Sequence, residues 1–385
     1  MNVEPFTVNR RLVLKAVDNC LGAVVNTITN HFCGRLGKVK VALGAALLSL
    51  LVSFPLYKGL SERLDDDVTI QALIVKFHNP LSPIPPELKD QHLYDGDASH
   101  NDKLELRLTL PILGWMSGTG KWTVVIWSPL AAMVVFYLLA RLGSQALGDD
   151  VAGALFVLAL APTFFGAWFF NDYNNGDGIA FMFLLFSIAS RNMVFASVSF
   201  LAAAFADERC VAAAPLLLLY FAVSLSQVEQ QNRRRKLYIA IIFGAGIWWL
   251  LRCWVAQSYH LAMGTSLLGT RSVIIGNLTN SFPSVFFDTF RAGWAIPLIA
   301  IICLSVQRRW AALLVYVGAF TCALAPALLV FDFDRSVCYA FPVLLASLCF
   351  LRGEKEAARK YLAAILVTNI LLISPGDSVL KIVTW

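Results

Sequence analysis

Three consecutive carboxylates, Asp65, Asp66 and Asp67, follow the first long apolar run of the chain. Adjacent carboxylates repel one another unless a cation or an arginine lies close to them. Such a group is typical of a general base or of a divalent-cation site. Exposed acids are also common where a helix ends and a loop begins. Both interpretations stay open for these three residues.

A second polar stretch, residues 171–178, separates two strongly apolar runs and holds Asp172 and Asp177. A carboxylate at the end of a membrane span is costly to desolvate, so it usually faces water, a cation or a substrate. The asparagines and glycine between the two acids favour a tight turn, and their amides can bind hydroxyls or hold the carboxylates. The alternative is a polar turn that only connects two spans.

A third charged cluster, Asp207, Glu208 and Arg209, lies between two almost wholly apolar runs. These side chains could bind a polar substrate at the end of a span. A local salt bridge that stabilises the turn explains them equally well, because membrane proteins usually carry charges as pairs.

The fourth cluster holds Asp332, Asp334 and Arg335, and Arg107 is a comparable base further upstream. The planar guanidinium of arginine matches the geometry of a phosphate group, and the two acids could pair with it or bind a cation. Pairing of each arginine with a neighbouring acid is the alternative for both Arg107 and Arg335.

The composition places these clusters in a membrane protein. The 385 residues are 58% hydrophobic and 15% charged, with a mean hydropathy of +0.67, whereas soluble domains are about 45–50% apolar and about 25% charged. A net charge of +6 is too small an excess to indicate nucleic-acid binding. Neither a P-loop nor a zinc-hydrolase motif occurs, and the eight cysteines show no metal-ligand spacing.

The apolar runs predict an all-α polytopic fold. A bilayer core needs helices of about 20 residues, which gives about eleven transmembrane helices. They are expected near 39–57, 122–141, 151–170, 178–190, 193–206, 210–226, 237–254, 293–307, 310–330, 337–351 and 361–374. The fourth to sixth of these are short, so their polar ends should be recessed.

The basic residues predict the orientation of the chain. Most of the 31 bases fall on one side when the N-terminus and every second loop are placed inside. This inner set includes Arg141, Arg191, the run 233–236 and Arg352. The N-terminus is then inside and the C-terminus outside. All four acidic clusters fall at the outer ends of spans.

Two parts of the chain differ in their expected role. Residues 1–37 form a cytoplasmic N-terminal segment, in which 11–32 has one apolar face and predicts an amphipathic helix. That helix lies in the membrane interface or packs against the bundle. Residues 38–385 form a single transmembrane domain with a large first outer loop, 58–121. Within this loop, 68–77 suits a short helix that lies on the membrane.

This arrangement resembles the GT-C class of integral-membrane glycosyltransferases, which take sugars from polyprenyl-phosphate carriers. In that class a catalytic acid follows the first span, within a large outer loop, and Asp65, Asp66 and Asp67 occupy that place here. A second acidic site commonly falls between the third and fourth spans, where this chain has Asp172 and Asp177. The resemblance is one of layout over roughly the first six spans.

The resemblance implies transfer of a sugar from a polyprenyl-phosphate carrier to a glycan or lipid acceptor at the outer face of the membrane. Asp66 or a neighbour would accept the proton of the acceptor, and Asp172 would orient the acceptor or bind a metal. A divalent cation, Mg²⁺ or Mn²⁺, is the expected cofactor, with Asp65 and Asp172 as candidate ligands. The expected substrate- and phosphate-binding residues are Arg335, Arg107, Asp177, Asp207, Glu208, Arg209 and Asp334. The expected location is a bacterial inner membrane, with the active face periplasmic or extracellular.

Two other functions are compatible with the sequence. A multi-pass transporter or flippase would place ionisable residues near the bilayer midplane and often shows inverted repeats, whereas these acids lie at span ends and no repeat is visible. A non-catalytic subunit of a polysaccharide or lipid assembly system would tolerate single carboxylate substitutions.

Overall fold

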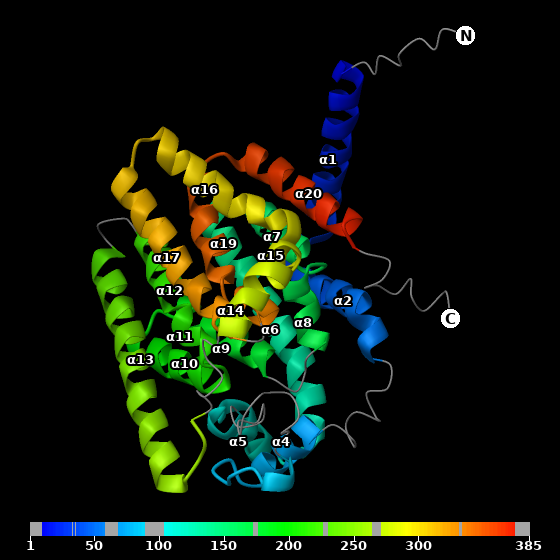
Figure 1. The fold of residues 1–385 in the computed structure, drawn as a ribbon. Coiled ribbons are helices and arrows are strands. Elements are labelled where there is room, and N and C mark those ends of the chain that lie inside the picture. Colours follow the sequence, from blue (N-terminus) through cyan, green and yellow to red (C-terminus); the bar gives the residue numbers. More distant parts are fainter. Residues whose placement is uncertain are drawn as a thin grey trace.

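The protein is built from helices, and no strand occurs among the residues that the structure describes (Figure 1). The computed structural model describes residues 10–32, 34, 36–57, 68–88, 104–171, 176–225, 230–263, 271–330 and 333–373. Asp65, Asp66, Asp67, Asp172 and Asp332 therefore lie outside the described residues. Asp334 belongs to a described helix, but its side chain is outside the description.

The helices of the first half are α1 (Arg10–Phe32), α2 (Gly37–Tyr57), α4 (Val68–His78), α5 (Thr109–Ser117), α6 (Trp122–Leu147), α7 (Asp150–Leu160), α8 (Phe164–Asn171), α9 (Asp177–Ala189) and α10 (Met193–Ala206). The second half contains α11 (Arg209–Ala212), α12 (Ala214–Ser224), α13 (Gln231–Tyr259), α14 (Arg271–Gly276), α15 (Phe282–Phe290), α16 (Ala295–Val306), α17 (Trp310–Leu328), α18 (Phe333–Cys338), α19 (Phe341–Leu348) and α20 (Lys355–Leu371). Short 3₁₀ turns occur at Pro86–Leu88, Arg291–Trp294 and Cys349–Leu351, and a π-helical turn joins α14 to α15 at Asn277–Ser281.

The helix lengths support membrane insertion. Within the described chain, α6, α13, α17 and the stretch Phe286–Val306 are each long and apolar enough to cross a membrane. Two bent pairs, α1 with α2 and α7 with α8, are apolar and long enough when each pair is counted as one span, which gives four to six candidate spans. These spans indicate an integral membrane protein. The eleven predicted spans are not confirmed, because α9, α10 and α12 have only 13, 14 and 11 residues. The sidedness of the termini stays a prediction.

Prolines break several of the predicted apolar helices. Pro162 separates α7 from α8, whose axes differ by 69°, because proline has no N–H to donate and clashes with the preceding turn. Pro215 and Pro342 occupy the first turns of α12 and α19, where proline is tolerated. The predicted runs 151–170, 210–226 and 337–351 are therefore helical, but each is divided.

The break between α7 and α8 frees backbone carbonyls inside the apolar core. Ser49 of α2 donates to the Ala161 carbonyl at 2.9 Å, and Arg291 donates to the Pro162 carbonyl at 3.0 Å. Asn369 of α20 donates to the Ala159 carbonyl at 2.8 Å. An unsatisfied carbonyl in an apolar medium costs several kcal/mol. Side chains from three distant segments thus make the broken helix tolerable.

Helix α6 lies at the centre of the bundle and contacts α2, α7, α9 and α19. Helix α10 packs between α9 and α13, and α20 covers α7. The core beside α6 is aromatic. Its rings lie 5.2–5.9 Å apart between centroids and belong to Phe136, Phe165, Phe169, Phe181, Phe290 and Phe341.

The described part of the first outer loop folds at one end of the bundle. There α4 and α5 contact each other, while α1 and α20 lie at the opposite end (Figure 1). The prediction of a short helix over 68–77 is confirmed by α4. Its Lys76 is fully buried and donates to the carbonyls of Ser82 at 3.0 Å and of Glu105 at 2.9 Å. This lysine ties α4 to the chain at Ser82 and at Glu105.

The predicted amphipathic helix at the N-terminus is confirmed as α1, which packs against α2, α7 and α20. The apolar side chains of its second half contact the core, and they are Leu21, Val24, Val25, Ile28 and Phe32. Lys360 of α20 pairs with Asp18 at 2.8 Å. The second half of α1 is therefore a packing helix against the bundle.

The close approach of α6 and α7 predicts that Gly153→Ala destabilises the protein. A Cβ atom there would lie 2.7 Å from the Ser144 nitrogen and 2.9 Å from the Ala140 carbonyl oxygen, both backbone atoms. Overpacking of this kind costs about 1–3 kcal/mol. The control is Gly318→Ala in α17, where the new Cβ meets nothing within 4 Å. Thermal unfolding in detergent should show a lower Tm for Gly153→Ala and an equal or higher Tm for Gly318→Ala. Equal shifts of the two would contradict this packing.

A second prediction concerns pH. Burial lowers the pKa of Lys76 to about 8 from an ordinary value of 10.5, although the charge of Glu105 opposes the shift. The folded state therefore holds this proton less tightly than the unfolded state. The free energy of unfolding should rise as pH increases from about 8 to 10.5. At about 1.4 kcal/mol per pKa unit, the gain is at most about 3.5 kcal/mol.

The comparison is with Lys76→Met, which has no amine to titrate. The difference in Tm between wild type and this variant should move in favour of wild type across that pH range. Parallel Tm curves for the two proteins would refute the shifted pKa.

Candidate functional site

The carboxylate of Asp177 is the centre of a buried network of charges. It is 0% exposed and accepts from donors on several elements. Its Oδ1 accepts from Arg209 Nη2 at 3.0 Å and from the Tyr339 hydroxyl at 2.7 Å. Its Oδ2 accepts from Trp168 Nε1 at 3.0 Å and from Arg335 Nε at 2.9 Å, and it forms an ion pair with Arg335 Nη2 at 2.7 Å. Two arginines thus neutralise and orient one acid.

Two glycines allow this acid to begin α9. Gly176 precedes the helix with φ of 76°, a left-handed conformation that glycine adopts without strain. At Gly178 a Cβ would lie 2.8 Å from the Phe169 ring, so only glycine lets α8 and α9 approach this closely. The helix N-terminus also favours a negative charge at its first residue.

Asp207 joins this centre to a second group of charges. Arg209 binds Asp207 through Nε at 2.7 Å and Nη2 at 2.6 Å, a bidentate geometry of high specificity. The other partner of Asp207 is Arg107, whose Nη2 lies 2.9 Å from Oδ2. Arg209 is thereby held between Asp177 and Asp207.

Glu208 is the most accessible acid of the network. Arg107 donates to it from Nη2 at 2.9 Å, and the side chain of Glu208 is 33% exposed. Burial raises the pKa of Glu208, and the charge of Arg107 outweighs this effect, so the pKa lies below its ordinary value. Glu208 is therefore ionised at neutral pH. Arg107 lies two residues before α5 in the outer loop. Its pairing with Glu208 therefore attaches this part of the loop to the bundle.

Aromatic rings line the buried side of the network. The guanidinium of Arg209 lies 5.1 Å from the centre of the Tyr339 ring, and that of Arg335 lies 5.7 Å from the Trp168 ring. These distances permit cation–π attraction. The Tyr339 ring also contacts the Phe181 ring at 4.8 Å. Tyr339 therefore connects the charged network to the aromatic core.

A fourth arginine, Arg252 of α13, gives the described network an excess of positive charge. Its charge acts on Glu208, Arg107 and Asp207. It donates to the Met263 carbonyl at 3.0 Å and lies over the Trp248 ring. Arg107 and Arg252 are each 4% exposed. Within the described chain, the Nη1 atoms of these two arginines have no hydrogen-bond partner. Two buried N–H groups are thus available to an acceptor.

The structure brings most of the predicted substrate- and phosphate-binding side chains into one network: Arg107, Asp177, Asp207, Glu208, Arg209 and Arg335. The predicted catalytic residues Asp65, Asp66, Asp67 and Asp172 lie outside the described residues, as does the side chain of Asp334. Their roles stay predictions. Among the described residues, no group of three or more His, Cys, Asp or Glu is placed to hold a metal ion.

Three residues of the network were not predicted as site residues from the sequence: Trp168, Tyr339 and Arg252. The signal for Arg252 was present, because a single charge inside an apolar run indicates a functional or paired residue. Tyr339 lies four positions after Arg335, a spacing that places both on one side of a helix. Trp168 carries no signal beyond an aromatic residue near the polar stretch.

The pairing of Asp177 predicts a large loss of stability in Asp177→Asn. The substitution removes the carboxylate charge that Arg335 binds and one of the two carboxylate charges that Arg209 binds, which costs about 3–5 kcal/mol. The matched control is Asp150→Asn. Its exposed carboxylate pairs with Lys38 at 2.8 Å at the surface, and such pairs contribute about 1 kcal/mol or less.

Thermal unfolding of both variants measures the difference. A double variant, Asp177→Asn with Arg335→Gln, restores the original net charge of the network and should be more stable than the sum of the two single changes predicts. Equal Tm values for Asp177→Asn and Asp150→Asn would show that the network contributes little to stability.

Comparisons with protein-family models, curated proteins and solved structures each give no match. The function of this chain is therefore inferred from the chemistry and geometry of its own residues.

Proposed function

We propose that this protein is a membrane glycosyltransferase that moves a sugar from a polyprenyl-phosphate carrier to a glycan or lipid acceptor. The network around Asp177 is the phosphate end of the proposed site. The reaction would occur at the outer face of the membrane, in the periplasm or outside the cell, as the charge pattern predicts.

One observation carries this proposal: buried guanidinium N–H groups remain available in a network whose described side chains include more arginines than acids. Arg107 and Arg252 each present a buried Nη1 without a partner among the described residues. A buried unpaired donor is costly, so an acceptor is expected there. Arginine forks bind phosphate oxygens through charge-assisted hydrogen bonds.

The ion pairs of the described carboxylates indicate which acids position the arginines and which would act as the base. Asp177 and Asp207 each bind two guanidiniums, and Glu208 binds one. A carboxylate held in this way is a poor general base, because protonation would break its ion pairs. We therefore assign these acids to positioning the arginines. The proton of the acceptor would go to Asp66, a neighbouring acid or Asp172.

The sequence position of Arg107 agrees with this division. Arg107 lies in the same outer loop, 58–121, as Asp65, Asp66 and Asp67. A single loop would then supply both the base and a phosphate ligand. A carrier with its phosphate in the network would keep its lipid tail in the bilayer, as a polyprenyl chain requires.

The core favours this enzyme over the alternative of a transporter. A substrate path would need polar groups along the bundle interior. Beyond Asp177, α9 instead buries Ile179, Phe181, Leu184, Leu185 and Ile188. The one buried hydroxyl of the same helix, Ser187, donates to the Ala196 carbonyl at 3.0 Å. Helix α9 therefore offers no polar path from the network into the bundle.

Binding of a polyprenyl monophosphate to the purified full-length protein tests the phosphate role. Arg252→Gln is expected to weaken binding about tenfold or more, as loss of one charge-assisted hydrogen bond implies. Arg235→Gln is the matched control, because Arg235 is an exposed arginine of the same helix. Native mass spectrometry in detergent measures the bound fraction. Equal binding by both variants would contradict the proposed phosphate site.

The catalytic role is tested separately in cells. Asp65, Asp66, Asp67 and Asp172 are each changed to Asn, and surface glycan and protein amount are measured. Loss of glycan at equal protein amount supports the enzyme. Unaltered glycan in all four variants would instead indicate a non-catalytic subunit, whether or not the lipid phosphate binds.

A further inference from the structure

A second polar site lies at the end of the bundle opposite the Asp177 network. It is a cavity of about 360 Å³ between α6, α9, α12, the start of α13 and the turn after α19. Helix α9 connects the two sites, with Asp177 at its first residue and Ala189, at its last, lining the cavity. Its 13 residues separate the two sites by about 20 Å at about 1.5 Å per residue.

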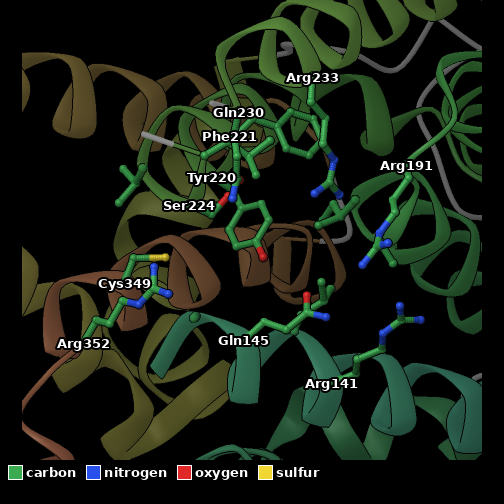
Figure 2. Close-up of a pocket in the computed structure, with 16 residues that line it drawn as sticks. Arg141, Gln145, Arg191, Tyr220, Phe221, Ser224, Gln230, Arg233, Cys349 and Arg352 are labelled. Atoms are coloured by element: carbon green, nitrogen blue, oxygen red, sulfur yellow. The ribbon is translucent and has the colours of Figure 1, made fainter. Parts of the chain in front are cut away.

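Four arginines from different elements line this cavity. They are Arg141 of α6, Arg191 after α9, Arg233 of α13 and Arg352 after α19, and Figure 2 shows their side chains around one space. Arg191 and Arg352 are exposed, while Arg141 and Arg233 are half-buried. All four belong to the set of bases that the charge pattern assigns to the cytoplasmic side.

The described lining contains no acid to balance these charges. In the described chain, Arg141, Arg191 and Arg352 form no ion pair. Arg233 donates once, to the Ser190 carbonyl at 3.2 Å, and its buried Nε has no partner among the described residues. The positive charge of Arg191 also acts on Arg233. Like charges gathered without a counter-charge repel one another, so this arrangement is suited to an anion.

Neutral groups of the lining add hydrogen bonds. Gln145 and Tyr220 face the same space as the arginines, with the Tyr220 hydroxyl directed into it (Figure 2). The lining also includes apolar side chains, among them Ile188, Val223 and Leu225. The volume falls within the range of about 300–1,000 Å³ that small-molecule sites occupy. A compact anionic group beside apolar side chains fits this lining.

We propose that this cavity binds a phosphate-bearing ligand through Arg141, Arg191, Arg233 and Arg352. Phosphate oxygens match the donor geometry of guanidinium, and a phosphomonoester or diphosphate carries enough charge to balance several arginines. The group belongs either to a lipid headgroup or to a soluble phosphate compound. This site is independent of the proposed glycosyl transfer, because it lies at the other end of the bundle.

The test uses the purified full-length protein with two probes. Pyrophosphate represents a soluble ligand and is titrated by calorimetry. Phosphatidic acid represents a lipid headgroup, and its retention is measured by native mass spectrometry in mixed micelles with phosphatidylcholine. Binding of either probe supports the site and identifies the source of the phosphate. Binding of neither probe to the wild type overturns the proposal.

The variants Arg191→Gln and Arg233→Gln are expected to weaken binding of the active probe about tenfold or more each. Arg235→Gln is the matched control, because this exposed arginine lies two residues from Arg233 and does not line the cavity. It should leave binding within about twofold of wild type, which is well under 1 kcal/mol. An equal loss in all three variants would indicate attraction to the general positive surface and would overturn the proposal.

Thermal unfolding separates ligand binding from a structural role. Without ligand, Arg191→Gln should have an equal or higher Tm than wild type, because it removes like-charge repulsion. The active probe should raise the Tm of wild type and of Arg235→Gln, but raise that of Arg191→Gln less. A lower Tm of Arg191→Gln without ligand, with the same rise on adding the probe, would show that the arginine is structural.

Discussion

The burial of one carboxylate, Asp177, is the constraint on which the described structure depends. An ionised acid in an apolar interior is tolerable only when charges and hydrogen bonds replace water completely. Here Trp168, Arg209, Arg335 and Tyr339 provide those bonds from α8, α11, α18 and the turn after it. These donors come from residues 168 to 339, which lie in both halves of the chain. The hydrogen bonds of the Asp177 carboxylate therefore fix where the two halves meet.

The two ends of α9 show two ways of keeping arginines in a membrane bundle. At one end the guanidiniums face carboxylates of the same chain, and the charges nearly cancel within a closed, aromatic surrounding. At the other end the guanidiniums face an open cavity whose described lining has no acid. The ion pairs around Asp177 hold the fold together. The arginines of the cavity depend on a counter-charge from the solvent or the bilayer.

The helices and the grouping of charges could be predicted from the sequence, because apolar runs locate helices and alternating direction decides which helix ends share a side. That reasoning grouped Arg107, Asp177, Asp207 and Arg335, and the structure brings them together. It did not find which acid pairs with which arginine, since pairing depends on side-chain direction. Nor could it find that Arg252 reaches the network, because this depends on how α13 is rotated about its axis. The helix breaks carried a signal in their prolines, while the donors that satisfy the freed carbonyls, such as Asn369, are set by tertiary packing alone.

The carbonyls freed at the α7–α8 break have a consequence for how the chain is made. Synthesis proceeds from the N-terminus, so Ser49 is already present when Ala161 enters the membrane, whereas Arg291 and Asn369 follow much later. Until Asn369 of α20 arrives, the carbonyl of Ala159 lacks the donor that it has in the finished protein. The bent pair α7–α8 must therefore remain beside water, the translocation machinery or a temporary partner during translation. Helix α20, which is synthesised much later, thus completes the hydrogen bonding of the α7–α8 pair.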